Sequence, residues 1–302
     1  MSALRSIRGR EVVFGYLFIM PSLLGLFAFV VIPVLASLGL SFCEWDLFGP
    51  VRFVGFRNFV KLAHDRNFWY YVLNTMVLMA AVPLTVVGSL FLALIMNQKL
   101  RGIKFFRLIF HLPTICAGVA IFVLWSWLYN NEIGLVNIVL RDLFRFFGIQ
   151  SQPPDWLGST LWAKPAIMLM TAWVRVGGRN VLLYLAALQN INPELYEAAE
   201  MDGARWWGKF WHITWPMVSP TTFFILVMSA IVGFQGGFEA AYVMTKGGPA
   251  GATTTVSYYI FNHAYRWFNM GYASAVAWLL FVIIFLITMI QWRIGNRVVH
   301  HD

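Results

Sequence analysis

Charge is scarce in this sequence: 12% of its 302 residues are charged, whereas 60% are hydrophobic. Soluble domains carry about a quarter charged residues, so this chain lacks the means to cover a core with a water-solvated surface. Several uninterrupted apolar runs also exceed the ~20 residues that cross ~30 Å of hydrocarbon. The composition therefore indicates a membrane protein and excludes a soluble all-helical one.

The sequence has two cysteines and no phosphate-binding loop motif. Cys43 and Cys116 are the only cysteines, they lie far apart, and we expect free, buried thiols in place of a disulfide framework or a metal cluster.

The net charge of +9 comes from scattered residues, so nucleic acid is not an expected partner. The chain has no Gly-x-x-x-x-Gly-Lys-Ser/Thr loop, so ATP hydrolysis is expected on a separate polypeptide, with no cofactor bound here.

The first apolar run, Val12 to Leu40, is too long for the core of a secretion signal, and no small-residue cleavage site follows it. We therefore expect it to be a retained first span.

Six apolar segments predict an all-α membrane protein with about six transmembrane helices. A helix satisfies its own backbone hydrogen bonds in lipid, and the ~10-residue alternating segments of a membrane β-barrel are absent. With no internal repeat or domain boundary, residues 1–302 are predicted to form a single transmembrane domain. The expected spans are 12–40, 70–96, 108–129, 161–189, 217–245 and 271–291.

Basic residues in short connections predict the orientation. By the positive-inside rule these connections lie in the cytoplasm, which places both termini and the 190–216 loop there. The residues concerned are Arg5, Arg8, Arg10, Lys99, Arg101, Lys104, Arg107, Arg293 and Arg297. On the opposite side, residues 137–147 predict a short amphipathic surface helix, either a packing element or a docking site.

The loop from Ile191 to Pro216 predicts two short helices separated by a glycine. Asn192 is a good N-cap and Pro193 suits the first helical position. Glutamates 194, 197 and 200 form an acidic stripe, and Gly203 can end the helix with φ > 0. Tryptophans 206, 207, 211 and 215 then predict a return along the membrane–water interface. The residues alone leave a plain amphipathic connector open as the alternative.

The segment EAAEMDGA, followed eight residues later by ITWP, resembles the EAA loop of bacterial ABC-importer permeases. Trp215 replaces the usual leucine. Matching residues are Glu197, Ala198, Ala199, Asp202, Gly203, Ala204, Ile213 and Pro216. An ordered series elsewhere, including GLVN at Gly134, MTKGGP at Met244 and GYASA at Gly271, resembles the maltose-type first permease subunit of carbohydrate uptake.

This resemblance implies the type I importer permease fold, a location in a bacterial inner membrane and a transport mechanism by alternating access. The EAA loop, with Glu197, Ala198, Ala199, Asp202, Gly203 and Ala204, would form a coupling helix that docks on an ATPase. The implied partners are a second homologous permease in a heterodimer, two copies of a cytosolic ATPase that bind ATP and Mg, an extracytoplasmic solute-binding protein, and membrane lipid.

Charges inside predicted spans mark a candidate solute pathway. Arg175 and Arg179 lie four residues apart, which on one helix gives a shared face. Either they pair with Glu239 or backbone carbonyls, or they line the cavity and contact an anionic solute. Further pathway candidates are Trp173, Gln235 and Phe238.

Import of a sugar or oligosaccharide, possibly acidic, is the function that the resemblance implies. A permease for a phosphorylated polyol, such as a glycerol phosphate, is the alternative on the same scaffold. A membrane-embedded enzyme is disfavoured, because His111 and His212 stand alone and no metal-spaced pair accompanies them.

Overall fold

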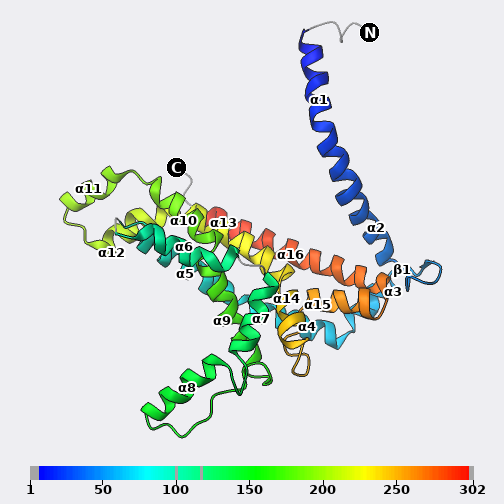
Figure 1. Ribbon diagram of the computed structural model, residues 1–302. Helices are drawn as coiled ribbons and strands as arrows, with labels where there is room; N and C mark the ends of the chain where they lie inside the picture. The colour runs from blue at the N-terminus through cyan, green and yellow to red at the C-terminus, as the bar shows by residue number, and fades with distance from the viewer. Residues whose placement is uncertain (1–6, 99–100, 116–117, 299–302) are drawn as a thin grey trace. The chain divides into compact units, whose positions relative to one another are not determined.

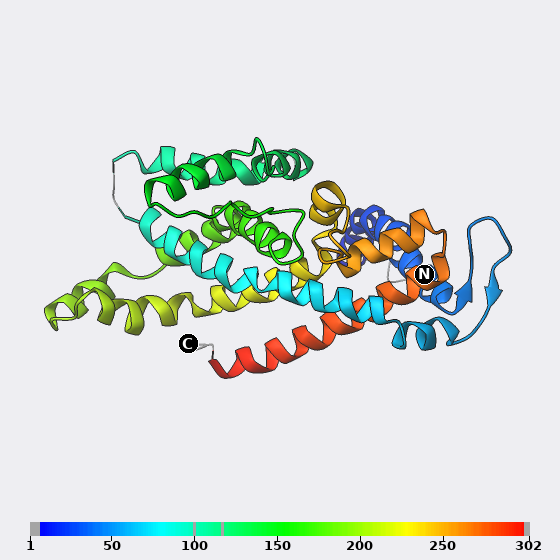
Figure 2. The same ribbon diagram turned by 90° about the horizontal axis from the view of Figure 1, so that it is seen from below.

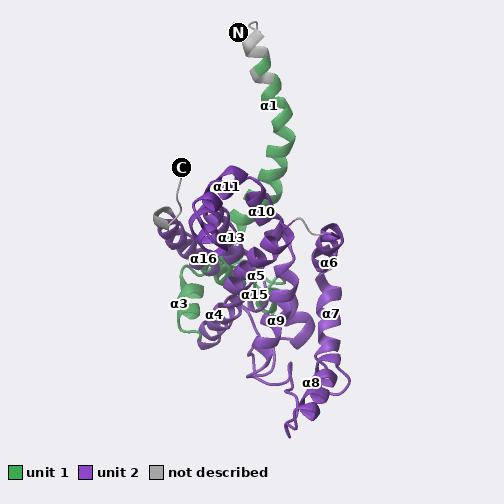
Figure 3. Cartoon of the chain, turned by 90° about the vertical axis from the view of Figure 1, so that its left-hand side faces the viewer, with its two compact units in different colours: residues 1–65, 260–279 green, residues 66–259, 280–302 purple. Residues whose placement is uncertain are grey.

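The structure is a computed structural model that describes residues 7–98, 101–115 and 118–298, so Arg5, Lys99 and Cys116 lie outside the described residues. The chain divides into two compact units (Figure 3). Unit 1 comprises Met1–Asp65 and Ile260–Leu279, and unit 2 comprises Arg66–Tyr259 and Leu280–Asp302.

Unit 1 begins with one long apolar helix. It consists of α1 (Ile7–Leu26), the π-helical turn η2 (Phe27–Val31) and α2 (Ile32–Ser41). An antiparallel hairpin follows, with β1 (Cys43–Glu44) paired to β2 (Arg52–Phe53), and then α3 (Arg57–Ala63). The buried Asn58 amide donates to the carbonyls of Ser41 (3.0 Å) and Cys43 (2.8 Å), which fixes the start of the hairpin.

The second stretch of unit 1 holds η5 (Asn262–Arg266) and the first turns of α16 (Met270–Val298). It binds back to the hairpin, because the Met270 amide donates to the Trp45 carbonyl at 3.0 Å. Tyr272 donates to the Asp65 carboxylate at 2.6 Å, and Lys61 lies 4.9 Å from the centre of the same ring.

His263 lies inside this polar cluster, 4.6 Å from the rings of both Trp267 and Tyr272. Burial above all, together with the charge of nearby Lys61 and against that of Asp65, lowers the pKa of His263 from 6.5 to about 4. Between pH 6.5 and about 4, His263 is therefore protonated in the unfolded chain and neutral in the folded chain. The folded state consequently loses stability as the pH falls through this range.

We expect thermal unfolding of the purified protein to reveal a loss of about 1 kcal/mol between pH 6.5 and 4, after allowance for solvent screening at this half-buried site. The pH dependence should flatten in His263→Gln. An unchanged slope in that variant would contradict the assignment to His263.

Unit 2 is a packed group of helices whose centre is formed by five elements. The elements are α4 (Arg66–Met79), α5 (Ala81–Met96), α9 (Ala163–Val176), α10 (Arg179–Gln189) and α13 (Trp215–Gln235). Aliphatic side chains of α5 and α10 fill the core around the fully buried Tyr184. Shorter elements complete the unit: α6 (Ile103–Ile115), α7 (Gly118–Leu128), α8 (Leu135–Phe146), α11 (Pro193–Met201), α12 (Trp206–Lys209), η3 (Phe210–Thr214), α14 (Phe238–Ala240), η4 (Ala241–Thr245) and α15 (Val256–Phe261), which ends in unit 1.

The all-α membrane fold is confirmed, with four helices long and apolar enough to cross a membrane in the described part of the chain. They are Phe14–Ser41, Arg66–Met96, Trp206–Thr245 and Met270–Gly295. A fifth is added if α6 and α7, which meet at 96°, make one bent span. The expected continuous span 161–189 is wrong: α9 has 14 residues and α10 has 11, because the chain breaks at Gly177 and Gly178.

The amphipathic helix expected over 137–147 is present as α8, at Leu135–Phe146. Its inner side is held by the buried Asn137, whose side-chain oxygen Oδ1 accepts a hydrogen bond from the Trp156 indole at 2.8 Å. Its other side exposes apolar residues such as Val139 and Phe146. In unit 2 it projects away from the central helices (Figure 1). Whether this side packs or docks stays a prediction.

Candidate functional site: cavities beside two broken helices, and an exposed loop

Two helix breaks create the polar interior of unit 2. The first separates α9 from α10 at Gly177 and Gly178. A Cβ on Gly177 would lie 2.0 Å from the Phe110 carbonyl oxygen of α6, so only glycine permits this approach. The second separates α13 from α14 at Gly236 and Gly237, where Gly237 has φ +83°.

A cavity of about 320 Å³ lies between α4, α5, α7, α9 and the second break. Its volume falls in the ~300–1,000 Å³ range of small-molecule sites. Most of the wall is apolar, for example Met79, Phe122 and Met170. Its polar lining residues are Thr75, Thr85, Thr171, Arg175, Glu239 and Thr255.

A second, smaller cavity of about 150 Å³ adjoins the first, since Arg175 lines both. Arg179, Asn180 and Ser229 add polar groups to this smaller cavity. The expectation that Arg175 and Arg179 share one face of a continuous helix is wrong, because the Gly177–Gly178 break lies between them. The tertiary fold still brings both guanidinium groups to one cavity.

The two arginines are not neutralised by carboxylates in close contact. Among the described residues, no carboxylate forms an ion pair within 4.0 Å with either arginine, as Asp142 does with Arg145 and Glu200 does with Lys209. Glu239 lines the larger cavity with Arg175 but forms no such pair. Arg175 is half-buried and Arg179 is exposed at the smaller cavity. An arginine without a carboxylate in close contact can bind an anionic group of a solute.

Other predicted pathway residues do not line either cavity. Trp173 packs against Trp125, with 5.5 Å between ring centres, and Phe238 stacks on Tyr242 at 5.5 Å. The side chain of Gln235 is exposed. The threonines that line the larger cavity were not predicted as pathway residues. A hydroxyl in an apolar span commonly donates a hydrogen bond to its own helix, as Thr85 does to the Val82 carbonyl at 2.7 Å, so it gives no signal of a site.

The loop expected to be two short helices has that form. The Asn192 side chain accepts from the Glu194 amide at 3.0 Å, and Pro193 opens α11. At the other end Gly203 has φ +78°, with amide bonds from Gly203 to the Glu200 carbonyl (3.0 Å) and from Ala204 to the Ala199 carbonyl (2.8 Å). This pair of bonds is the Schellman C-cap, which favours glycine at its left-handed position.

The α11 surface is exposed within this chain. Glu197, Ala198, Asp202 and Gly203 are exposed, and Met201 is 90% exposed. Ala199 and Ala204, which form the C-cap bond, are half-buried. Within unit 2, α11 and α12 lie beyond the cluster of central helices in both views (Figures 1 and 2). Small residues on an exposed short helix leave room for another backbone to approach.

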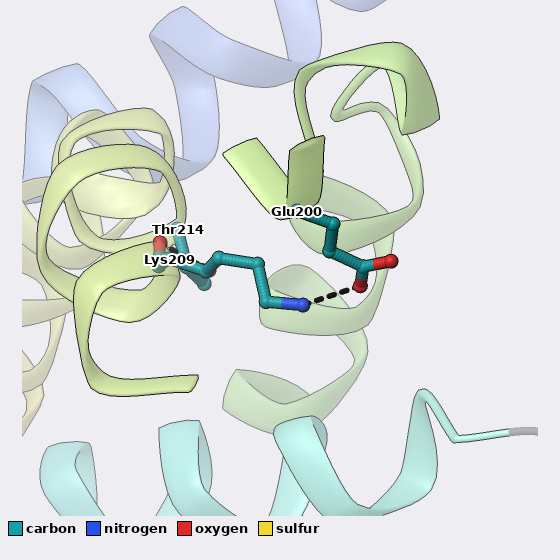
Figure 4. A network of polar contacts seen from close by, with 3 residues as sticks. All are labelled: Glu200, Lys209 and Thr214. Atoms are coloured by element: carbon teal, nitrogen blue, oxygen red, sulfur yellow. Dashed lines mark hydrogen bonds and ion pairs between the residues drawn. The ribbon is translucent and has the colours of Figure 1, made fainter. Parts of the chain in front are cut away.

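The return segment is tied to α11 by polar contacts. Lys209 donates to the Glu200 carboxylate at 2.5 Å (Figure 4). The Thr214 hydroxyl contacts the Lys209 carbonyl at 3.4 Å and the Tyr196 hydroxyl at 2.9 Å. Trp206 stacks on Phe210 at 5.6 Å, while Trp206 and Trp207 remain more than half exposed. Side-chain contacts therefore link the two halves of the loop, and its aromatic rings are available to the membrane interface.

Comparison with known proteins gives consistent matches along the chain. Residues 62–300 match the model of the family described as binding-protein-dependent transport system inner membrane component. The probable ABC transporter permease protein YesP of Bacillus subtilis (strain 168) is 38% identical over 307 residues, covering 100% of this chain and 96% of that protein. The lactose transport system permease protein LacF of Rhizobium radiobacter is 34% identical, covering 92% of each.

A solved structure shares the fold. It is a bacterial ABC transporter involved in the import of the acidic polysaccharide alginate, matched with a TM-score of 0.83 over 96% of this chain and 98% of that chain. At 24% sequence identity the likeness concerns the fold alone.

Proposed function

Because the chain belongs to the family of binding-protein-dependent transport system inner membrane components, we propose that it carries a sugar or oligosaccharide through the cavities beside its broken helices. It is a multi-pass inner membrane permease of an ABC importer, and a separate subunit hydrolyses ATP. The observation that carries the solute proposal is the 320 Å³ cavity lined by Arg175 and Glu239. Its mix of apolar wall and few polar groups suits a small hydroxyl-rich ligand.

In this proposal the chain acts as one transmembrane domain that pairs with a second, homologous permease. Both termini and α11 face the cytoplasm. The exposed α11 surface, with Glu197, Ala198, Asp202 and Gly203, docks in one of two ATPase subunits, supported by Ala199 and Ala204 in the C-cap. Closure of the ATPases then moves the cross-linked α11–η3 loop, and alternating access follows. The chain itself holds no cofactor.

We propose further that the solute is an acidic saccharide. Support comes from Arg175 and Arg179 at one cavity, without carboxylates in close contact to neutralise them. Arginine binds a carboxylate by two parallel hydrogen bonds, which a neutral sugar does not reproduce. The alginate importer that shares the fold handles an acidic polysaccharide.

A phosphorylated polyol is the second candidate solute. The same two arginines favour it, because guanidinium groups bind phosphate as well as carboxylate. The smaller cavity of about 150 Å³ would hold the phosphate more readily than a saccharide.

The test is Arg179→Ala in the assembled importer reconstituted with its binding protein. Uptake of an acidic oligosaccharide should fall by about tenfold or more, the effect of losing ~1.4 kcal/mol of charge-assisted binding. Uptake of a neutral oligosaccharide of equal length should change by less than about twofold, because hydroxyl groups lose no ionic partner. Arg179→Lys is expected to recover part of the acidic uptake.

Asn180→Ala, a change at a neighbouring residue of the same cavity that keeps both arginines, is the matched control. Equal loss of neutral and acidic uptake in Arg179→Ala would contradict the acidic-solute proposal. Selective loss of glycerol phosphate uptake would favour the second candidate.

A further inference from the structure

A separate hollow lies in unit 1, outside the apolar span segments. Its volume is about 420 Å³, and it lies between the β1–β2 hairpin and the turn that joins η5 to α16. Seven residues give it its chemistry: Glu44, Trp45, Asp46, Arg52, Trp267, Phe268 and Asn269. By the proposed orientation both walls face the extracytoplasmic side. We propose that this hollow is a saccharide-binding subsite on the extracytoplasmic side of the permease, an inference that rests on the proposed function.

The walls combine the groups that bind sugars. Indole rings from Trp45 and Trp267 offer flat apolar faces, and Trp267 is 58% exposed. Arg52, Asp46 and Asn269 add donors and acceptors that match the vicinal hydroxyl groups of a sugar ring. Arg52 also offers a bidentate partner to a uronate carboxylate.

The Asp46 carboxylate is held in place before any ligand arrives. Asp46 Oδ1 accepts from the amides of Gly49 (2.7 Å) and Phe48 (3.2 Å). The Gly49 hydrogen bond above all, with the charge of Arg52 also contributing, lowers the pKa of Asp46, so its carboxylate stays ionised. Arg52 stands opposite Glu44 in the antiparallel register. A fixed acceptor and a nearby cation reduce the ordering cost of ligand binding.

The aromatic wall is equally constrained. Trp267 meets His263 edge to face at 4.6 Å, and its amide donates to the Asn262 carbonyl at 2.9 Å. Phe268 has φ +50° and contacts the Phe48 ring at 5.3 Å, while Leu47 in the facing hairpin has φ +71°. Such left-handed conformations are unfavourable for large side chains and persist where surrounding structure holds them, as at ligand sites.

The shape favours a small ligand over a docked protein. The hollow falls in the ~300–1,000 Å³ range of small-molecule pockets, whereas a standard protein interface covers ~800 Å² on each partner. Its location in unit 1 separates it from the arginine cavities of unit 2.

The experiment uses the complete importer in nanodiscs, without binding protein, and records saturation-transfer NMR on maltohexaose and on hexagalacturonate as neutral and acidic probes. For at least one probe, Trp267→Ala should reduce the transfer signal by about fivefold or more, as expected for loss of an anchor residue. Arg52→Ala should reduce the hexagalacturonate signal more than the maltohexaose signal. Phe53→Ala is the matched control, since Phe53 lies in the same hairpin, is 80% exposed and does not line the hollow.

A second measurement, the affinity of the binding protein for the same nanodiscs, identifies the source of any defect. The proposal expects Trp267→Ala to leave this affinity within about twofold, since the residue would not be an interface anchor. Weakened binding-protein affinity with an unchanged saccharide signal would overturn it in favour of protein docking. If the unmodified importer transports a saccharide but Trp267→Ala gives the same saccharide signal as the unmodified importer, the subsite alone is overturned. Absence of any saccharide-dependent uptake would instead overturn the proposed function.

Discussion

Replacing Gly203 with valine is expected to separate this permease from its ATPase and to stop uptake. Gly203 has φ +78°, a conformation that costs an L-residue about 1–2 kcal/mol and a β-branched one more. The C-cap that closes α11 would open, and the new side chain would stand on the exposed face proposed to dock. Since ~1.4 kcal/mol is a factor of ten in affinity, co-purification of the ATPase and uptake should both fall by more than tenfold.

Two further variants separate backbone strain from docking. Gly208→Ala is the control, since its Cβ would lie 3.7 Å from the Ala204 methyl group, an ordinary contact, and it should keep the ATPase. Ala198→Trp adds bulk to an exposed helical position without strain, and it should lose the ATPase as Gly203→Val does. Normal association in Ala198→Trp would refute docking through this face of α11.

Replacing Gly177 with alanine is expected to be the most damaging single-methyl change in unit 2. The added Cβ would lie 2.0 Å from the Phe110 carbonyl oxygen, which is backbone and cannot turn aside as a side chain does. Overpacking of this kind costs ~1–3 kcal/mol even where side chains yield, so a larger loss is expected here. The α6 and α9–α10 segments would separate, and with them the cavity that holds Arg175 and Arg179. Heating in detergent, followed by size-exclusion chromatography, measures the loss of folded protein.

Gly39→Ala is the control for this prediction. Gly39 lies within α2, and nothing lies within 4 Å of its added Cβ. Alanine in a helix interior stabilises by about 0.5–1 kcal/mol relative to glycine, so this variant should be at least as heat-resistant as the natural protein. Equal heat resistance of Gly177→Ala and Gly39→Ala would contradict the close α6 contact.

Local chemistry was enough to predict several elements. Apolar length identified the helix ending at Ser41 and the helix starting at Met270, because a membrane demands ~20 apolar residues wherever they fold. The form of the EAA-like loop also followed from neighbours in sequence. Asn192 caps α11 through the amide two residues on, and Gly203 ends it, so both signals act within one or two helical turns.

Packing between segments distant in the chain decided which predicted residues line the cavities. Arg175 and Arg179 were predicted to share a helix face, yet they meet at one cavity across a break that depends on Phe110, a residue of another helix. Likewise Trp173 and Phe238 have the right chemistry for a pathway but face aromatic neighbours. By itself the sequence determined which segments are apolar and where the EAA-like loop bends, since both depend on adjacent residues. Only the tertiary structure decided where the helices break and which side chains line the cavity, because a glycine break and a cavity wall both depend on segments distant in the chain.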